Sequence, residues 1–298
     1  MTAGFKIAGA PISWGVSEVP GWGRLLAADH VLAEMAELGL RATELGPPGY
    51  LPDPQSDLAR HGLDLVGGFL AVPLHDVATA RASVDAAAQA AEQMARCGGE
   101  VVVLAAATGL TGYDERPALG DQEWRRLIET ADRIAEVVAG HGLRTVLHPH
   151  VGTHVETEEE VERFVADSPM PLCLDTGHLL IGGTDPVALA QRHPGRIGHI
   201  HLKDVRADLA EQVRAGAVPF TAAVAQGLFV PLGDGDVDTE AMLRAVHRAG
   251  YAGWYVLEQD TALDERSPVD VPRRDTARSL AHLDRIFARL PEDQPDRG

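Results

Sequence analysis

The chain has 298 residues, 45% of them hydrophobic, which is enough to bury the core of a single α/β domain of barrel size. Its formal net charge of −18, from 26 basic and 44 acidic residues, argues against nucleic acid as a partner, because phosphates would be repelled. The two cysteines, Cys97 and Cys173, are too few for a disulfide framework. Residues Met1–Lys6 show no leader pattern, and the sequence contains no apolar run of membrane length. We therefore expect a cytoplasmic protein with no membrane partner.

Short apolar runs alternate along the chain with longer segments of helical composition, and this alternation is typical of βα units that build a parallel sheet. The expected strands, in chain order, are Lys6–Ile12, Arg41–Glu44, Leu63–Ala71, Glu100–Ala105, Arg144–His148, Pro171–Asp175, Arg196–His201 and Gly253–Glu258. Eight strands of this kind predict a closed (β/α)₈ TIM barrel, in one domain that spans residues 1–290.

Apolar residues at three- and four-residue spacing predict a helix in most of the gaps between strands. The expected helices are Ala28–Leu38, Thr79–Cys97, Asp121–Gly140, Glu158–Asp167, Asp185–Arg192 and Thr239–Ala249. A glycine precedes many strands, and such a glycine supplies the left-handed residue that ends a helix. These positions are Gly39, Gly62, Gly98, Gly99, Gly142, Gly195 and Gly250.

Two insertions interrupt the βα rhythm. The segment Gly46–Pro52 follows the second strand, and the segment Val205–Asp236 follows the seventh and is too long for a simple loop. Since both follow strand ends, we expect both to overhang the mouth of the barrel and to shape a pocket. Asp238 is expected to cap the helix after the second insertion. The polar, proline-rich residues 291–298 are interpreted as a frayed tail.

Metal-ligand side chains stand at the ends of four successive strands. They are His148, Asp175, His201 and Glu258. The carboxyl ends of barrel strands converge on one mouth, so two imidazoles and two carboxylates can meet around one divalent ion there. Each alone is more often a hydrogen-bonded core or loop residue, but four in successive units favour a site. The set contains no sulfur, which argues against structural zinc.

Neighbouring residues leave several assignments open. His150 or His154 could replace His148 as ligand if the strand ends elsewhere. Strand alternation places His201 and Lys203 on one inward face. It leaves His201 and Glu258 at the rim, with apolar partners a layer below. Lys203 would add a cation and Asp204 a carboxylate at the mouth, although a solvated turn explains Asp204 equally well. His178 could contact substrate, orient a ligand or only begin a helix.

Two residues near the first strands could line the pocket. Glu44 would act as a base or as a hydrogen-bond acceptor, and Trp14 would form an apolar wall; otherwise they are a rim charge and a packing residue. The chain has no Gly-x-Gly-x-x-Gly after its first strand and no phosphate loop. A nucleotide cofactor is therefore unsupported.

Six motifs occur in an order that resembles a known family. They are Ala10-Pro11-Ile12-Ser13-Trp14-Gly15, Thr43-Glu44-Leu45-Gly46, His148-Pro149-His150-Val151-Gly152-Thr153, Asp175-Thr176-Gly177-His178, His199-Ile200-His201-Leu202-Lys203-Asp204 and Glu258-Gln259-Asp260. They resemble the inosose dehydratase group of the xylose-isomerase-like sugar isomerase and epimerase barrels, over nearly the whole chain.

This resemblance implies a lyase of inositol catabolism that removes water from 2-keto-myo-inositol to give a trihydroxycyclohexane dione. It implies one divalent ion, Mn²⁺ or Co²⁺ before Zn²⁺, Fe²⁺ or Mg²⁺. By matching position, the ligands are His148, Asp175, His201 and Glu258. Glu258 or Glu44 would be the base, and Lys203, His150 or His178 the acid. The residues around the substrate would be Trp14, His150, Thr153, His178 and Lys203.

Two departures from related sequences bear on the reaction. Many of the isomerases and epimerases carry Glu where His148 stands, which leaves one metal-bound Glu here and favours dehydration. Glu258-Gln259-Asp260 is contiguous, whereas the dehydratases carry extra residues before the Gln-Asp pair. The alternatives are a ketose isomerase or epimerase, a non-catalytic sugar-binding barrel and, remotely, a nuclease of the endonuclease-IV type. A homo-oligomer is compatible with the sequence.

Overall fold

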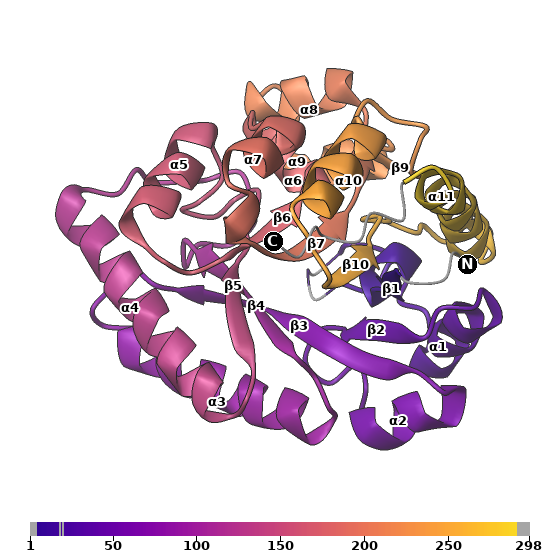
Figure 1. Ribbon diagram of the computed structural model, residues 1–298, viewed down its shortest axis with the longest axis horizontal. Coiled ribbons are helices and arrows are strands. Elements are labelled where there is room, and N and C mark those ends of the chain that lie inside the picture. Colours follow the sequence, from indigo (N-terminus) through magenta and orange to yellow (C-terminus); the bar gives the residue numbers. More distant parts are fainter. Residues whose placement is uncertain (1–4, 18, 20, 291–298) are drawn as a thin grey trace, which may run out of the picture.

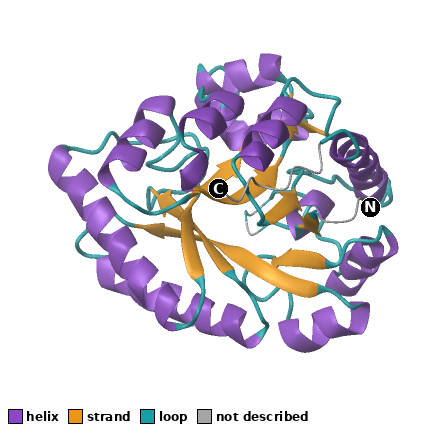
Figure 2. Ribbon diagram, viewed as in Figure 1, coloured by secondary structure: helices purple, strands orange, loops and turns teal. Residues whose placement is uncertain are grey.

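The barrel predicted from the sequence is present. The computed structural model of the chain describes residues 5–17, 19 and 21–290; the start of the chain and the segment interpreted as a tail lie outside these residues. Eight parallel strands close in the order β1-β10-β7-β6-β5-β4-β3-β2. Figure 1 shows helices packed around the outside of these strands, and Figure 2 shows the same layers by type of element.

The barrel strands are β1 (Lys6–Gly9), β2 (Ala42–Leu45), β3 (Asp64–Pro73), β4 (Val101–Ala107), β5 (Arg144–Leu147), β6 (Leu172–Asp175), β7 (Ile197–Leu202) and β10 (Trp254–Leu257). The helices are α1 (Ala28–Glu37), α2 (Pro54–His61), α3 (Ala80–Arg96), α4 (Asp121–Gly140), α5 (Glu158–Asp167), α6 (Thr176–Gly182), α7 (Pro186–Arg192), α8 (Ala207–Arg214), α9 (Phe220–Ala225), α10 (Thr239–Arg248) and α11 (Val271–Phe287). Two short 3₁₀ helices are η1 (Pro11–Trp14) and η2 (Pro194–Arg196). All eight expected strands and all six expected helices are present, with ends shifted by a few residues.

Alternation along β4 explains how the core divides into two layers. Val101 and Val103 point into the barrel, whereas Val102 and Leu104 join the larger cluster between strands and helices. The barrel interior is filled mainly by alanine and valine side chains, which pack against one another across it. This packed interior supports the mouth from below.

Side-chain caps fix where helices begin. At the start of α5, the Thr157 hydroxyl accepts from the Glu160 backbone N–H, and the Glu160 carboxylate accepts from the Thr157 N–H. This reciprocal pair satisfies two N–H groups that the helix itself leaves open. Asp238 caps α10 by accepting from the Ala241 N–H at 2.9 Å, as the sequence predicts.

The long insertion after the seventh strand is folded rather than a loop. It contains α8, α9 and a two-stranded antiparallel sheet of β8 (Asp204–Val205) and β9 (Phe229–Val230). Sequence periodicity also missed α2, α6 and α11. Four of the five missed helices have eight residues or fewer, and short helices carry too few turns for a clear periodic signal.

Most of the expected helix-ending glycines have positive φ. They are Gly39, Gly62, Gly98, Gly142 and Gly250; Gly99 and Gly195 are not among the positive-φ glycines. In the part of the chain that the structure covers, no helix is both long and apolar enough to cross a membrane. The cytoplasmic location and the oligomeric state stay predictions.

Gly67→Ala should destabilise the barrel. Gly67 lies in β3 against β4, and a Cβ there would stand 2.1 Å from the Val101 carbonyl oxygen. Backbone cannot move aside as a side-chain tip can, so we expect the free energy of unfolding to fall by about 3 kcal/mol. Gly140→Ala is the control, because a Cβ at this helical position meets nothing within 4 Å. It should raise stability by up to about 1 kcal/mol. Equal urea midpoints for the two variants would contradict this packing argument.

Candidate metal centre and active site

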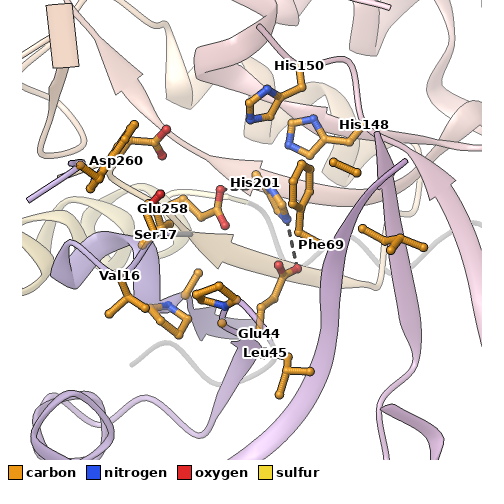
Figure 3. Close-up of a pocket in the computed structure, with 18 of the residues that line it drawn as sticks. Val16, Ser17, Glu44, Leu45, Phe69, His148, His150, His201, Glu258 and Asp260 are labelled. Carbon is orange, nitrogen blue, oxygen red and sulfur yellow. Dashed lines mark hydrogen bonds and ion pairs between the residues drawn. The ribbon is translucent and has the colours of Figure 1, made fainter. Parts of the chain in front are cut away.

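The four predicted ligands meet at the mouth of the barrel. Asp175 ends β6, and its register partner His201 lies in the neighbouring β7. His148 directly follows β5 and Glu258 directly follows β10. The parallel strands bring these residues together although 110 positions separate His148 from Glu258 in the sequence. Figure 3 shows His148, His201, Glu258 and Glu44 facing one space.

Donor atoms of three ligands converge most closely. His201 Nδ1 lies 3.2 Å from Glu258 Oε2 and 3.5 Å from Asp175 Oδ2. One donor atom from each of Asp175, His201 and Glu258 falls within 4.8 Å of the others. His148 joins through Asp175, because its Nε2 lies 3.4 Å from Asp175 Oδ2. Buried oxygen and nitrogen donors at these separations can hold a divalent cation.

The two carboxylate oxygens of Asp175 have different roles: one caps a helix and the other faces the site. Oδ1 accepts from the backbone N–H groups of Gly177 at 2.9 Å and of His178 at 2.8 Å, and so caps α6. Oδ2 is fully buried and has no hydrogen-bond partner among the described residues. A buried carboxylate oxygen without a hydrogen bond is costly unless cations lie beside it. The Lys203 ammonium lies 3.4 Å from Oδ2, and a divalent ion would add a second cation. The cap thus aims the second oxygen at the centre.

Glu44 orients an imidazole. Its Oε1 accepts hydrogen bonds from His201 Nε2 at 3.0 Å and from His199 Nε2 at 2.8 Å. With Nε2 donating, the Nδ1 lone pair of His201 is left for the centre, which is the usual pairing of carboxylate, histidine and metal. Glu44 was expected to be a base or a substrate acceptor, and these two bonds favour an orienting role. The layer beneath His201 contains His199 and is therefore not apolar, contrary to expectation.

Charge at the centre also fits a bound cation. Burial alone would lower the pKa of His201, but Cys173, Glu258 and Glu44 outweigh burial and hold that pKa well above its ordinary value. The structure thus favours a positive charge at the position where Asp175 and Glu258 meet His201 Nδ1. A divalent ion would replace the imidazole proton there. The charge and the donor atoms of these residues therefore fit a metal site.

The structure favours His148 over His150 as the fourth donor. The Nδ1–H of His148 donates to the Pro149 carbonyl oxygen at 2.7 Å, which leaves Nε2 free on the side of Asp175. His150 instead borders the cavity, and its ring lies 3.7 Å, centroid to centroid, from that of His178. His154 lies away from the centre, with its ring 4.3 Å from that of His75.

Lys203 brings an ammonium into the centre. Nζ lies 2.8 Å from Asp260 Oδ1, 3.0 Å from Glu258 Oε2 and 3.4 Å from Asp175 Oδ2, and the side chain is 3% exposed. Burial would lower the pKa of Lys203, but these three carboxylates raise it well above the ordinary value. Gly177 makes room for this side chain, because a Cβ there would stand 2.7 Å from Lys203 Cβ.

His178 lies behind the cavity and does not border it. Its Nε2 lies 3.1 Å from Lys203 Nζ, and its ring is 1% exposed beneath His150. Burial, His150 and Lys203 lower its pKa well below the ordinary value, so the ring is neutral. His178 was expected to contact substrate, to orient another residue or only to begin a helix. Its contact with Lys203 Nζ fits the second role, in which it orients the lysine. Direct substrate contact does not fit this position, because His150 covers the ring.

A cavity of about 300 Å³ opens above the centre. One side carries the polar groups His148, His150, His201, Lys203 and Glu258, and also Asp260, which the contiguous Glu258-Gln259-Asp260 motif turns toward Lys203. The rest of the lining is mostly apolar; it includes Ile12, Val16, Trp22, Pro47, Pro48 and Phe69, whose ring lies 5.9 Å from that of His148. Pro47 and Pro48 confirm that the insertion after β2 shapes the pocket. The size suits a small cyclic ligand.

Besides His178, two other residues expected around the substrate do not border this cavity. Trp14 is fully buried in the core, and its indole N–H donates to Glu34 Oε2 at 2.7 Å. The indole of Trp22 lines the cavity instead. The Thr153 hydroxyl donates to the His150 carbonyl oxygen at 2.8 Å and so stabilises the turn behind the wall. Only Trp14 was expected at the pocket, because it lies just beyond the first strand, and Trp22 was missed.

Asp204 is an internal anchor, so neither expected reading, a carboxylate at the mouth or a solvated turn, is correct. It is 1% exposed, and its carboxylate accepts backbone N–H groups from Val205, Gly233, Gly235 and Val237 at 2.8–3.0 Å. These bonds fold the end of the long insertion back against β8. Burial raises the pKa of Asp204, although the four N–H groups oppose this.

Asp204→Asn should therefore loosen the insertion. The amide would turn an N–H₂ donor toward backbone donors, and we expect the free energy of unfolding to fall by roughly 2 kcal/mol. Asp208→Asn, in the exposed first turn of α8, is the matched control and should change it by less than about 0.5 kcal/mol. Limited proteolysis within residues 232–237, which Asp204 holds, should also become faster in Asp204→Asn and not in Asp208→Asn. Identical cleavage rates would count against the anchor.

The sequence is similar to proteins of known name over most of its length. Residues 32–286 match the model of the family described as xylose isomerase-like TIM barrel. An inosose dehydratase of Geobacillus kaustophilus (strain HTA426) is 36% identical over 275 residues, which are 87% of this chain and 89% of that protein. The rhizopine catabolism protein MocC of Rhizobium meliloti is 37% identical over 280 residues, 89% of this chain and 84% of that protein.

Solved structures share the fold at lower identity. An L-ribulose 3-epimerase superposes with a TM-score of 0.72 at 19% identity, and the match covers 98% of this chain and 100% of that one. The probable 3-DHS dehydratase AsbF from Bacillus anthracis gives a TM-score of 0.67 at 19% identity, with 93% and 99% covered. At such identities the likeness extends to the barrel alone.

Proposed function

This chain belongs to the xylose isomerase-like TIM barrel family, and we propose that it is a divalent-metal-dependent dehydratase of 2-keto-myo-inositol or a close cyclic keto-polyol. The inosose dehydratase that is 36% identical covers nearly the whole chain and supports this substrate class. The observation that carries the reaction type is the contact between Lys203 Nζ and Glu258 Oε2, 3.0 Å apart beside the donor cluster. This contact puts a proton donor and a proton acceptor at the cavity.

The metal would be held by Asp175, His201 and Glu258, with His148 as fourth donor. An ion bound there supplies Lewis acidity toward a ketone oxygen, worth several kcal/mol. Mn²⁺ and Co²⁺ suit a mixture of imidazole and carboxylate ligands. Glu44 keeps His201 in the tautomer whose Nδ1 lone pair faces the donors.

Proton transfer is assigned to the contacting pair. Burial alone would raise the pKa of Glu258, but His201 and Lys203 lower it to about 2, so the carboxylate is ionised at neutral pH. Glu258 removes the proton α to the ketone. Lys203 gives a proton to the β-hydroxyl, whose C–O bond breaks as water leaves. The resulting enol tautomerises to the dione. Glu258 then releases the proton that it removed to solvent, and solvent returns a proton to Lys203.

His150 is suited to bind a substrate hydroxyl rather than to exchange protons. Burial, His148 and Lys203 lower its pKa to about 3, so the ring is neutral at physiological pH. Its Nδ1–H donates to the Val151 carbonyl oxygen at 2.7 Å, which leaves Nε2 as an acceptor. His150 borders the cavity, so this acceptor fits a hydroxyl of the polyol.

Carboxylate placement favours dehydration over epimerisation. Epimerisation requires a base and an acid on opposite faces of one carbon. Among the cavity carboxylates, Glu44 is held by His199 and His201, and Asp260 faces Lys203. Glu258 is thus left as the carboxylate next to the donor cluster and an acid. This single-sided arrangement suits loss of water.

The test is an absorbance assay on metal-stripped protein given 2-keto-myo-inositol. Restoring Mn²⁺ or Co²⁺ should produce an ultraviolet band from the dione and its enol, and His201→Ala should produce none. No band, together with metal-dependent interconversion of ketoses, would replace the proposal by an isomerase or epimerase. Tight metal binding with no turnover of any of these substrates would indicate a non-catalytic sugar-binding barrel.

A further inference from the structure

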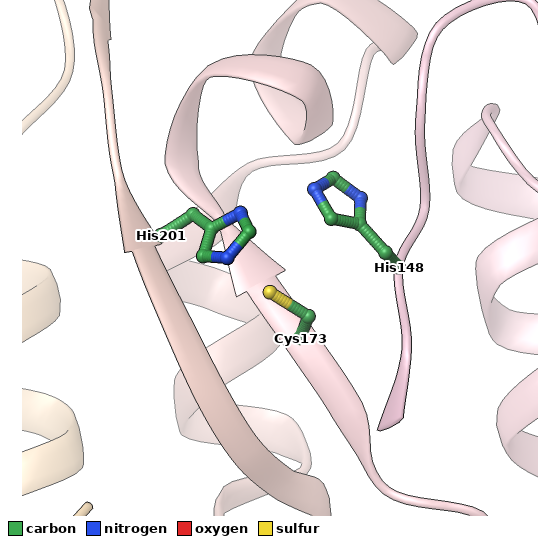
Figure 4. A group of neighbouring side chains, drawn as sticks. All are labelled: His148, Cys173 and His201. Carbon is green, nitrogen blue, oxygen red and sulfur yellow. The ribbon is translucent and has the colours of Figure 1, made fainter. Parts of the chain in front are cut away.

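A cysteine lies directly below the proposed metal centre. Cys173 is fully buried in β6, two residues before Asp175, so both side chains point to the barrel interior from successive layers. Its register partner is His199, whereas that of Asp175 is His201. Figure 4 shows the thiol directed toward the space between the imidazoles of His148 and His201.

The donors around this space form a set of their own. One donor atom from each of His148, Cys173 and His201 falls within 4.8 Å of the others, and all three residues are at most 1% exposed. His201 Nδ1 is buried and makes no hydrogen bond among the described residues, although it lies 3.2 Å from Glu258 Oε2. Bonds of about 2.3 Å to sulfur and about 2.0 Å to nitrogen need donors roughly 3.5 Å apart, so small side-chain movements are enough.

We propose that Cys173, His148 and His201 form a second, thiophilic metal site that binds Cd²⁺ or Zn²⁺ one layer below the carboxylate-rich centre. Sulfur with two imidazoles selects soft or borderline ions, whereas two carboxylates with imidazole suit Mn²⁺. Binding forms a metal–sulfur bond and releases the thiol proton to solvent. The proposal goes beyond the reaction, since it requires no turnover.

The two sites cannot be filled together, because both use His201 and His148. A thiophilic ion held by Cys173 would draw these imidazoles down, away from Asp175 and Glu258. The site would therefore act as a trap that competes with Mn²⁺. This gives the barrel a metal selectivity that depends on one sulfur atom.

The test uses the two cysteines of the chain as site and control. Metal-free wild type, Cys173→Ser and Cys97→Ser are titrated with Cd²⁺, and the sulfur-to-cadmium charge-transfer band is recorded in the ultraviolet. Cys97 lies at the partly exposed end of α3, outside the barrel interior. Wild type and Cys97→Ser should show a band that saturates at one equivalent and is suppressed by excess Mn²⁺. Cys173→Ser should lose the band and bind Cd²⁺ at least about tenfold more weakly.

Several results would overturn the proposal. They are a band that persists in Cys173→Ser, a band lost in Cys97→Ser, or wild-type protein that gives no band with Cd²⁺. Cadmium NMR on wild type keeps the test decisive if Cys173→Ser does not fold, because the chemical shift reports directly whether sulfur is a ligand. A shift typical of oxygen and nitrogen ligands alone would refute the site. None of these outcomes depends on the dehydratase reaction.

Discussion

Asp175→Asn should abolish metal binding and turnover while the fold stays intact. An asparagine oxygen still accepts the N–H groups of Gly177 and His178, so the cap of α6 is kept. The negative charge at Oδ2, which faces His201 Nδ1 and His148 Nε2, is lost. We expect Mn²⁺ affinity to fall at least about 100-fold and turnover at least about 1,000-fold. Calorimetric titration with Mn²⁺ and the absorbance assay measure the two effects.

Asp185→Asn is a matched control for this variant. Asp185 caps α7 with the same geometry, accepting from Val187 N–H at 2.8 Å and Ala188 N–H at 3.2 Å, but it is exposed and outside the site. Asp185→Asn should leave metal affinity and turnover unchanged, and both variants should unfold close to the wild-type midpoint. Full Mn²⁺ affinity in Asp175→Asn would remove Asp175 from the ligand set.

Lys203→Met should produce the second large effect. The substitution keeps the length of the side chain and removes the ammonium that contacts Glu258 and Asp260. With no acid at the leaving hydroxyl, kcat should fall by about 10²- to 10⁴-fold, while KM changes much less. Unpaired buried carboxylates should also lower the free energy of unfolding by roughly 3 kcal/mol, so rates are compared at a temperature where both proteins are folded.

Lys6, the other lysine of the chain, provides the control for Lys203. Lys6 and Lys203 are the only two lysines, and the other basic residues among the 26 are arginines. The Lys6 ammonium lies 5.6 Å from the Trp254 ring centroid at the start of β1, at the opposite end of the barrel from the mouth. Lys6→Met should leave kcat unchanged. A Lys203→Met enzyme with wild-type kcat would show that Lys203 is not the acid.

The sequence by itself determined the barrel and the residues that meet at its mouth. Eight apolar runs of strand length, separated by helical periodicity, leave a closed parallel sheet as the simplest packing. His148, Asp175, His201 and Glu258 each stand at or next to a strand end, and in a parallel barrel those ends share one rim. Position along a strand is a local property, so the chain reveals it without coordinates.

Only the tertiary structure decided what the remaining side chains do. Which tryptophan borders the cavity depends on how the segment after β1 turns, and this turn brings Trp14 to Glu34 and Trp22 to the pocket. Asp204 is an anchor because the chain returns beside it about thirty residues later, at Gly233 and Gly235. Such roles come from contacts between distant segments, which periodicity and local propensity do not encode. The same holds for Cys173, whose place between two imidazoles results from the alignment of three neighbouring strands.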